Sequence, residues 1–311
     1  MKRKRTTERY TLADLESWRE ATRGLDPPIG LGVFGDPVAH SLSPPMQNAA
    51  LKHCNIPMQY ARFHIRANEL RSSLDALAKL DLVGVNLTVP HKIAALQFMD
   101  DVAENTRSIG AVNTIKIENG KLRCFNTDGR GFSRAIREEF SVDLRDLRVL
   151  LLGAGGAARA IARQCAKENC ERLVVANRTF DKAKKVTDDL VDFFAGPKVF
   201  GPVPRLQAIP WEEPAIRFQI GHVDLIVNAT PLGLNRADSS PIPPRLLAPH
   251  LMIYDTVYSR ERTPFISAAV EAGARSANGL SMLLHQGVLA FEIWFEREAP
   301  INVMRKALGG T

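Results

Sequence analysis

The sequence predicts an α/β protein with two domains, each an open, largely parallel sheet covered by helices. Three observations lead to this prediction. A chain of 311 residues is long enough for two compact domains with separate cores. Apolar strand-like runs alternate with amphipathic stretches in two series, one from residue 29 and one from about residue 147. A glycine-rich turn joins the first strand and the first helix of the second series.

The first series is introduced by residues 1–28, in which 11–23 predict one helix capped by Thr11 with Leu12, Leu15 and Trp18 on one side. Buried or half-buried strands are then predicted at 29–35, 59–65 and 82–89, and helices at 44–54 and 68–80. Residues 111–127 predict a hairpin because Asn119-Gly120 lies between two alternating segments. A helix at 128–140 leads out of this domain.

The second series begins with a strand, the glycine turn and a helix that together cover residues 147–167. Further strands are predicted within 172–179, 223–233 and 252–258, and further helices at 182–194, 263–274 and 280–298. The proline-rich segment 196–217 gives no clear pattern, and we assign it no element.

Composition excludes several classes of protein. The net charge is +7, but the basic residues are spread along the chain without a nucleic-acid motif, so a small anionic substrate or cofactor is the expected partner. No apolar run approaches the roughly 20 residues of a membrane span, and no apolar region follows the basic start. The four cysteines and seven histidines show no metal-binding spacing, so no metal is expected and the cytoplasm is the expected location.

The glycine turn follows the pattern GxGxxA, with Gly153, Gly155 and Ala158 at the fixed positions. The first glycine permits a tight turn, the second lets the backbone approach a pyrophosphate, and the small third residue lets helix and strand pack closely. The N–H groups of Gly156 and Ala157 would then meet the pyrophosphate at the helix start, next to Ala154. Because both the strand and the helix are present, dinucleotide binding is favoured over a merely tight turn.

The end of the next strand indicates which dinucleotide is bound. NAD enzymes usually carry Asp or Glu there to bond the ribose 2′-hydroxyl, whereas this strand ends in Asn177, Arg178 and Thr179. A guanidinium at this place suits a 2′-phosphate, so NADP is the predicted cofactor. Asp181 lies close by and leaves some use of NAD open.

Lys92 stands in an unexpected place, because VGVNLTVPHKIAAL predicts a strand that ends at a proline and a helix that begins near the lysine. The positive end of a helix costs a lysine roughly 0.3–1 kcal/mol. A lysine that reaches bulk solvent is the simple interpretation. The alternative is a functional lysine, because strand ends in open α/β sheets face a ligand crevice.

Nine ordered segments now identify a resemblance. They are FGDPVAHSLSPPMQNAAL, GVNLTVPHK, GAVNT, FNTDGRGF, LLGAGGAARA, ANRT, VNATPLG, YDTVY and NGLSMLLHQG, and they span about residues 30–295. Together they resemble the shikimate/quinate dehydrogenase family, and shikimate dehydrogenases in particular. The resemblance implies the NADP-dependent reversible reduction of 3-dehydroshikimate to shikimate in aromatic amino-acid (chorismate) biosynthesis.

The resemblance also implies an architecture. We expect an N-terminal mixed-sheet α/β substrate domain at 29–130, a Rossmann-type NADP-binding domain at 131–282, and a C-terminal helix that returns to the first domain with residues from about 283 to 311. Residues 1–28 lie outside the resemblance as an N-terminal extension, which we expect to be dispensable for turnover. The expected assembly is a monomer or homodimer.

Family roles carry over to matching positions. Lys92 and Asp128 resemble the catalytic acid–base pair. The helix start and a partly dry cleft disfavour a charged lysine, whereas the carboxylate favours it, so we expect a coupled pair. Residues that resemble substrate contacts are Ser41, Ser43, Asn86, Thr88, Asn113, Tyr258 and Gln286. Residues that resemble cofactor contacts are Gly153, Ala154, Gly155, Gly156, Ala157, Asn177, Arg178, Thr179, Thr230, Gly279 and Met282.

Several alternatives are open at this point. Ser43 is also placed to cap the helix that follows it. A quinate/shikimate dehydrogenase that uses NAD is the nearest rival function, and the surroundings of Ser41 and Ser43 would decide between the substrates. A catalytically silent relative that senses the metabolite is a rival of another class, which the presence of both Lys92 and Asp128 disfavours. Gln47 departs from the family pattern, which often has histidine there.

Overall fold

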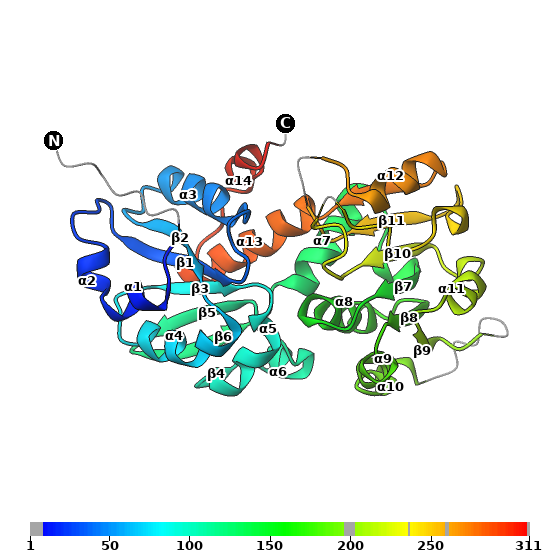
Figure 1. Ribbon diagram of the computed structural model, residues 1–311, viewed down its shortest axis with the longest axis horizontal. Helices are drawn as coiled ribbons and strands as arrows, with labels where there is room; N and C mark the ends of the chain where they lie inside the picture. The colour runs from blue at the N-terminus through cyan, green and yellow to red at the C-terminus, as the bar shows by residue number, and fades with distance from the viewer. Residues whose placement is uncertain (1–8, 196–202, 236, 259–260, 310–311) are drawn as a thin grey trace. The chain divides into compact units, whose positions relative to one another are not determined.

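The computed structural model describes residues 9–195, 203–235, 237–258 and 261–309 (Figure 1). The basic start of the chain and the first residues of the proline-rich segment therefore lie outside the described residues. The chain forms two compact units. Unit 1 comprises Met1–Thr127 with Gln286–Thr311, and unit 2 comprises Asp128–His285. Helix α13 (Leu280–Phe295) begins in unit 2 and ends in unit 1, as the prediction of a returning C-terminal helix requires.

Unit 1 contains a six-stranded mixed sheet in the order β2-β1-β3-β5-β6-β4. Its strands are β1 (Ile29–Gly35), β2 (Gln59–His64), β3 (Gly84–Leu87), β4 (Asp101–Val102), β5 (Thr114–Glu118) and β6 (Lys121–Phe125). Strand β1 is parallel to β2 and β3, whereas β3, β5 and β6 pair antiparallel. The predicted hairpin between β5 and β6 is confirmed, and its turn residues Asn119 and Gly120 have φ of 52° and 74°.

Helices cover both faces of this sheet. They are α3 (Ser43–His53), α4 (Leu70–Leu77), α5 (His91–Ala94), α6 (Glu104–Ile109) and α14 (Ile301–Ala307), with 3-10 turns at Ala67–Glu69 and Ala95–Phe98. Helices α3 and α14 contact each other on one face, and α4 packs on the other (Figure 1).

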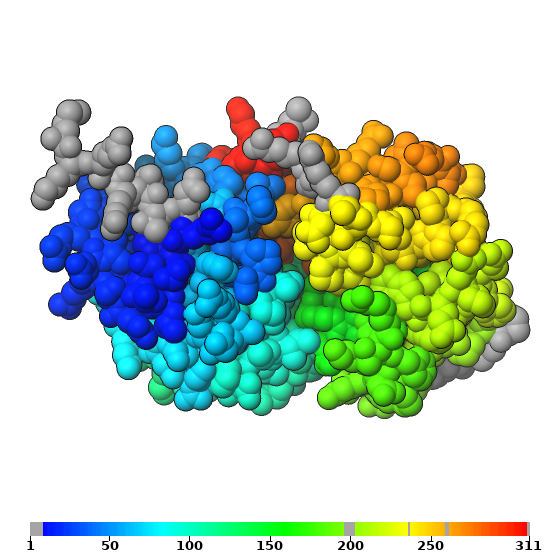
Figure 2. Space-filling view, viewed as in Figure 1, coloured from blue at the N-terminus to red at the C-terminus, as the bar shows by residue number. Residues whose placement is uncertain are grey.

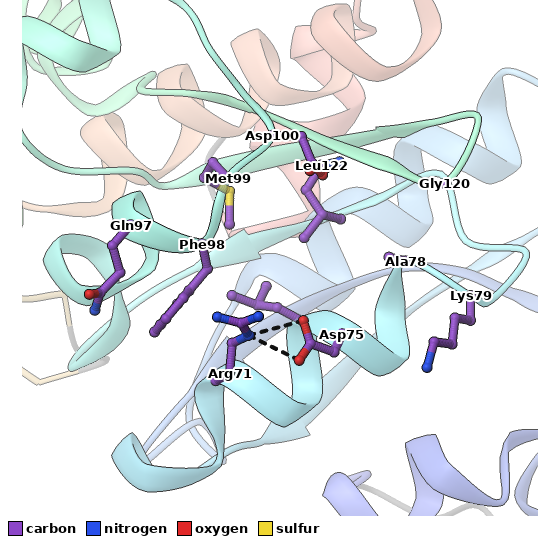
Figure 3. Close-up of a pocket in the computed structure, with 11 residues that line it drawn as sticks. Arg71, Asp75, Ala78, Lys79, Gln97, Phe98, Met99, Asp100, Gly120 and Leu122 are labelled. Carbon is purple, nitrogen blue, oxygen red and sulfur yellow. Dashed lines mark hydrogen bonds and ion pairs between the residues drawn. The ribbon is translucent and has the colours of Figure 1, made fainter.

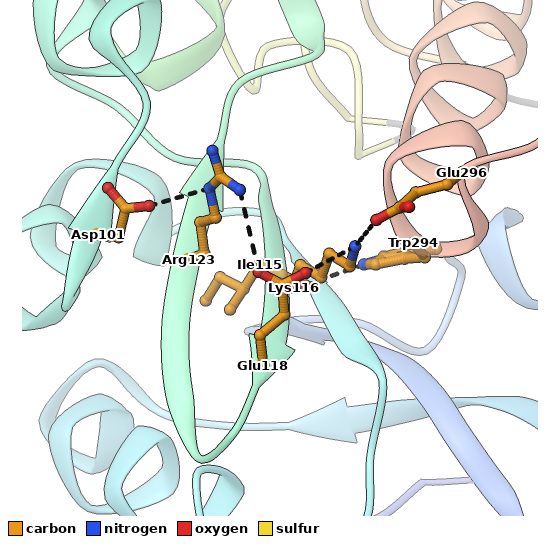
Figure 4. Close-up of polar contacts among 7 residues, drawn as sticks. All are labelled: Asp101, Ile115, Lys116, Glu118, Arg123, Trp294 and Glu296. Atoms are coloured by element: carbon orange, nitrogen blue, oxygen red, sulfur yellow. Dashed lines mark hydrogen bonds and ion pairs between the residues drawn. The ribbon is translucent and has the colours of Figure 1, made fainter.

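The end of α13 is held against the sheet of unit 1 by the side chain of Trp294 and by an ion pair between Lys116 and Glu296 (Figure 4). A Cβ on Gly84 would lie 2.4 Å from the indole nitrogen of Trp294, so glycine at this position makes room for the indole. The indole N–H donates to the carbonyl of Ile115 at 2.9 Å. Next to it, Lys116 Nζ lies 2.8 Å from Glu118 and 2.5 Å from Glu296.

Residues 9–28 pack against unit 1 and form part of its surface (Figure 2). The predicted single helix at 11–23 is wrong, because the structure has two short helices, α1 (Leu12–Glu16) and α2 (Trp18–Ala21). The hydroxyl of Ser17 donates to the carbonyl of Ala13 at 2.8 Å and competes with the helical backbone bonds at the break. Thr11 is the N-cap, as predicted.

Unit 2 contains a six-stranded parallel sheet in the order β12-β11-β10-β7-β8-β9. Its strands are β7 (Arg148–Leu152), β8 (Arg172–Asn177), β9 (Leu206–Pro210), β10 (Leu225–Asn228), β11 (Met252–Asp255) and β12 (Arg275–Asn278). Counted from the first strand of the unit, this is the 3-2-1-4-5-6 order of the Rossmann fold. The predicted fold class, a mixed-sheet domain plus a Rossmann-type domain, is therefore confirmed.

The helices of unit 2 mostly follow the predicted ranges. They are α7 (Asp128–Phe140), α8 (Gly156–Lys167), α9 (Phe180–Asp188), α10 (Val191–Phe194), α11 (Glu213–Ile220) and α12 (Pro264–Glu271), with 3-10 turns at Leu144–Asp146 and Pro244–Leu246. The single helix predicted at 182–194 is wrong, since the structure has two helices, α9 and α10, with a break at Asp189–Leu190. The unassigned proline-rich segment contributes β9 and the start of α11, and β12 is a strand that the sequence pattern missed.

Candidate active site

The glycine turn of unit 2 is shaped for close approach of a ligand. Gly153 has φ of +115°, and a Cβ there would come within 2.9 Å of the carbonyl of Ala229. Gly155 faces open space, since a Cβ there would meet nothing within 4 Å. Helix α8 then begins at Gly156 with its free N–H groups beside this space. The turn therefore fits the pyrophosphate of a dinucleotide.

The turn lies where the strand order of the sheet reverses, between β7 and β10. Ligands of doubly wound sheets bind at this point, beyond the carboxyl ends of the strands. Asn228 at the end of β10 pairs with Leu152 at the end of β7, and the N–H of Ala229 donates to Leu152 at 2.9 Å. Thr230 follows, and its methyl group would lie 3.0 Å from a Cβ on Gly153. The structure thus brings Thr230 together with the glycine turn.

The end of β8 carries the residues predicted to choose the cofactor. Arg178 is exposed and has no polar partner among the described residues. The side-chain amide of Asn177 donates to the carbonyl of Thr179 at 2.9 Å and fixes the turn that presents the arginine. Asp181, in the first turn of α9, is also exposed. An unpaired guanidinium at this strand end fits a 2′-phosphate.

Polar side chains of unit 1 gather at the end of β3 and just before the start of β5. The amide of Asn86 donates to the carbonyl of Asn113 at 3.0 Å and accepts from the hydroxyl of Tyr60 at 2.8 Å. The amide of Asn113 exchanges two bonds of 2.8 Å with Thr127 and lies 3.4 Å from Gln286. Asn86, Asn113 and Gln286 are therefore brought into one network, and their common role toward the substrate stays a prediction.

The serine pair follows β1 at the same edge of the sheet. The hydroxyl of Ser41 accepts from the N–H of Ser43 at 3.3 Å, at the start of α3. The alternative that Ser43 caps this helix is wrong, because Ser43 is its first residue, Leu42 is the N-cap, and no side chain caps it. Ser41 is half-buried and Ser43 is buried. Thr88 packs over Gly35, where a Cβ would lie 2.4 Å from its methyl group.

The backbone around Lys92 is held on three sides within unit 1. The N–H of Asp36 donates to Val89 at 2.9 Å, and the N–H of Val112 donates to the carbonyl of Lys92 at 2.7 Å. His91 is 1% exposed and its Nε2 bonds the carbonyl of Ile65 at 2.7 Å. Burial lowers the pKa of His91, against the bond to Ile65 and the field of Asp36. A neutral, buried His91 therefore anchors the half-buried Lys92.

Asp128 opens both α7 and unit 2. It is 3% exposed and lies in the first turn of a 13-residue helix. The next residue, Gly129, lets α7 approach α8 closely, because a Cβ there would lie 2.7 Å from the carbonyl of Ala160. The close packing of α7 on α8 at Gly129 thus fixes the position of the neighbouring Asp128 side chain. Its pairing with Lys92 stays a prediction.

The remaining predicted residues lie in the loops after β11 and β12. Gly279 leaves no room for a side chain, since a Cβ would meet the carbonyl of Thr256 at 2.1 Å. The N–H of Met282 donates to the hydroxyl of Tyr254 at 3.1 Å, and Met282 packs in the core of unit 2. Tyr258 is half-buried. The roles of these residues toward substrate or cofactor stay predictions.

Sequence reasoning missed a buried carboxylate, Asp255, at the end of β11 and its partner Asn228 at the end of β10. The sequence did carry a signal for this pair, because the apolar strands in VNA and YDT each end in a polar residue.

A groove of about 530 Å³ lies elsewhere in unit 1, lined by residues such as Arg71, Asp75 and Phe98, and contains none of the predicted site residues (Figure 3).

No group of three or more His, Cys, Asp or Glu side chains in the part of the chain that the structure describes is arranged to hold a metal ion. No helix in the described ranges combines the length and the apolar character that a membrane crossing needs.

The fold and the site define a class of two-domain proteins. One domain has a Rossmann-type dinucleotide site, and the other carries a group of polar side chains at the ends of its strands. Comparison with known proteins narrows this class. Residues 33–115 match the shikimate dehydrogenase substrate binding domain, residues 134–195 match shikimate/quinate 5-dehydrogenase, and residues 279–308 match the shikimate 5′-dehydrogenase C-terminal domain.

A shikimate dehydrogenase (NADP(+)) from Methanopyrus kandleri is 39% identical over 280 residues, which cover 89% of this chain and 94% of that protein. The chain therefore belongs to the shikimate dehydrogenase family. The crystal structure of shikimate 5-dehydrogenase from Thermus thermophilus with NADP(H) and shikimate is similar, with a TM-score of 0.78, 33% identity, and coverage of 90% of this chain and 98% of that one. Quinate dehydrogenase from Corynebacterium glutamicum with NAD has a TM-score of 0.77, 28% identity, and the same coverage.

Proposed function

We propose that this protein catalyses the NADP-dependent reversible reduction of 3-dehydroshikimate to shikimate, a step of aromatic amino-acid (chorismate) biosynthesis. The observation that carries the choice of cofactor is the unpaired, exposed Arg178 at the end of β8, where no carboxylate stands. NADP, when bound, supplies or accepts the hydride.

The residues of unit 2 that would hold NADP divide into three groups. The glycine turn, with Gly153, Ala154, Gly155, Gly156 and Ala157, offers backbone N–H groups to the pyrophosphate. Asn177, Arg178 and Thr179 face the 2′-phosphate. Thr230, Gly279 and Met282 shape the nicotinamide side.

Unit 1 would hold most of the substrate. Ser41 and Ser43 bind the carboxylate through hydroxyl groups, which suit an anion without burying a second charge. Asn86, Asn113 and Gln286 are already aligned by mutual hydrogen bonds, so they can bind ring hydroxyls without large rearrangement. Thr88 and Tyr258 complete the proposed set.

Lys92 and Asp128 are proposed as the acid–base pair. In the oxidation of shikimate the pair would take the hydroxyl proton while the carbon gives up its hydride to the bound cofactor and the C=O bond forms. In reduction the pair returns this proton to the new hydroxyl. The buried His91 holds the backbone next to Lys92, so the lysine side chain starts from a fixed position.

An absorbance assay at the nicotinamide band tests this proposal by crossing shikimate and quinate with NADP and NAD. We expect shikimate with NADP to give the largest kcat/KM. A preference for quinate with NAD would support the second candidate function, for which the exposed Asp181 is the motivating residue. No turnover with any pair, together with tight shikimate binding, would support a silent metabolite sensor.

Two further expectations complete the proposal. The described cysteines are all free, three of them buried, and this composition suits the cytoplasm. We expect a monomer or homodimer, which light scattering after size exclusion will distinguish.

A further inference from the structure

A carboxylate is buried at the carboxyl end of the sheet in unit 2, and its hydrogen-bond partners among the described residues are all uncharged. Asp255 ends β11 and is 0% exposed. Oδ1 accepts from the side-chain amide of Asn228 at 2.9 Å and from the N–H of Val257 at 3.1 Å, and Oδ2 accepts from the hydroxyl of Thr263 at 2.6 Å. Three donors therefore replace water around this group, although none of them carries a charge.

The carboxylate and the backbone of the turn after β10 together set which way the amide of Asn228 points. Asn228 is fully buried and is the register partner of Asp255 on the neighbouring strand. An ionised carboxylate only accepts hydrogen bonds, so the NH₂ group of Asn228 must face it. The amide oxygen then faces the other way and accepts from the N–H of Thr230 at 3.1 Å and from its hydroxyl at 2.7 Å.

Thr230 is oriented as a result. Its hydroxyl hydrogen points to Asn228, and its oxygen accepts from the N–H of Leu232 at 3.2 Å. The NH₂ group of Asn228 also donates to the carbonyl of Leu232 at 2.9 Å, so the whole turn at residues 229–233 closes on Asn228. This turn lies against Gly153 of the glycine turn.

We propose that Asp255 is a positioning residue for the cofactor side of the site, acting through Asn228 to hold Thr230 in its binding orientation. The inference rests on the proposed function, in which Thr230 contacts NADP. Asp255 does not touch the reacting atoms. Its role is to strengthen, together with the carbonyl of Leu232, one of the two amide orientations of Asn228.

Protonation of Asp255 would weaken its hold on Asn228, because a carboxylic acid carries a donor of its own. Burial raises the pKa of Asp255 to about 6, while Thr263, Val257 and Asn228 pull it down. No charged side chain among the described residues of β10, β12, α12 or the loop at 229–235 contributes to this pKa. Asp238, which follows this loop, accepts from the N–H groups of Gly233 and Asn235.

The test measures NADP affinity of the full chain from pH 5 to 8 for the wild type, Asp255→Asn and the matched control Asp238→Asn. The 2′-phosphate of NADP itself titrates near pH 6 and affects all variants alike. The informative quantity is therefore the ratio of the variant's Kd to the wild-type Kd at each pH. We expect Asp255→Asn to bind NADP roughly tenfold more weakly at pH 8, the effect of one charge-assisted hydrogen bond, and to approach wild type at pH 5. Asp238→Asn should follow wild type throughout, and a constant ratio for Asp255→Asn across this range would overturn the proposal.

The double variant Asp255→Asn/Thr230→Val checks the route. If Asp255 acts through Thr230, the double variant should bind no more weakly than the weaker single variant. Additive losses would overturn the route. A Thr230→Val variant with normal NADP affinity would instead show that the proposed cofactor contact is wrong.

A second variant keeps the proposal testable if Asp255→Asn does not fold. Thr263→Val removes one donor from the carboxylate and should move the low-pH loss of affinity to higher pH, because the ionised form is less stabilised. An unmoved pH dependence in a folded Thr263→Val protein would contradict the proposal.

Discussion

Replacing Leu15 by alanine should destabilise unit 1, because residues 9–28 are part of its core. Leu15 is 2% exposed and belongs to the same apolar cluster as Phe34 and Phe63 of the sheet. Removing a buried leucine side chain costs about 2–4 kcal/mol of unfolding free energy, from lost transfer and the cavity left behind. The exposed neighbour Glu16 provides the control, since Glu16→Ala should change the same free energy by less than about 0.5 kcal/mol.

Deleting residues 1–27 should cost more than this single change. Tyr10 continues the edge of β2, with its N–H bonded to Arg62 at 2.9 Å and its carbonyl to His64 at 2.7 Å. The Tyr10 ring lies 5.5 Å from that of Trp18, which stacks on Phe63 at 5.8 Å, and each such pair adds about 0.5–1.5 kcal/mol. The truncated protein would expose a strand edge and an aromatic face.

Urea unfolding followed by tryptophan fluorescence measures these effects, and Trp18 reports on the segment directly. Turnover per folded molecule should be unchanged in Leu15→Ala, because the segment contains none of the proposed site residues. A Leu15→Ala protein as stable as Glu16→Ala would refute the view that this segment belongs to the core. Normal stability with lost turnover would show that the segment completes the site instead.

Three further changes test the site. Arg178→Ala should weaken NADP by about 1.5–3 kcal/mol and leave NAD nearly unaffected, and equal losses in binding assays would exclude the 2′-phosphate role. Ser41→Ala should raise the KM for shikimate without changing NADP affinity, whereas normal shikimate binding by Ser41→Ala/Ser43→Ala would remove the carboxylate assignment. Because the folded pKa of Asp255 is about 6, above the roughly 3.9 of an unfolded aspartate, native protein holds the extra proton and loses stability as pH rises from 4 to 7. The unfolding free energy of wild type relative to Asp255→Asn should therefore fall by about 2 kcal/mol over that range, and a flat difference would contradict the raised pKa.

Periodicity and turn chemistry predicted the elements whose signals are local. The buried strands and the Asn119-Gly120 hairpin were found because each pattern reports on its own residues. Ser17 broke a predicted helix through a hydroxyl bond to Ala13 that competes with the backbone. Strand β12, with the polar sequence RSAN, lies at the sheet edge and needs no apolar run. A short edge strand of this kind has little signal in a single sequence.

The candidate site was predictable where a motif dictates the backbone. Gly153 and Gly155 are examples, since the tight turn and the open space follow from glycine itself. The Asp255–Asn228 pair was not predictable, because it depends on β10 and β11 being neighbours in register. The same is true of His91, whose anchoring role depends on the carbonyl of Ile65 on a separate segment.

Turnover of Lys92→Ala with shikimate and NADP tests the central proposal most directly. We expect turnover to fall about 10²–10⁴-fold, the usual contribution of general acid–base catalysis, while NADP affinity barely changes. Asp128→Ala should fall in the same range, and the double variant should be little worse than the worse single one because the two residues act as a unit. Near-normal turnover of a folded Lys92→Ala enzyme would leave the lysine unexplained and contradict the acid–base mechanism.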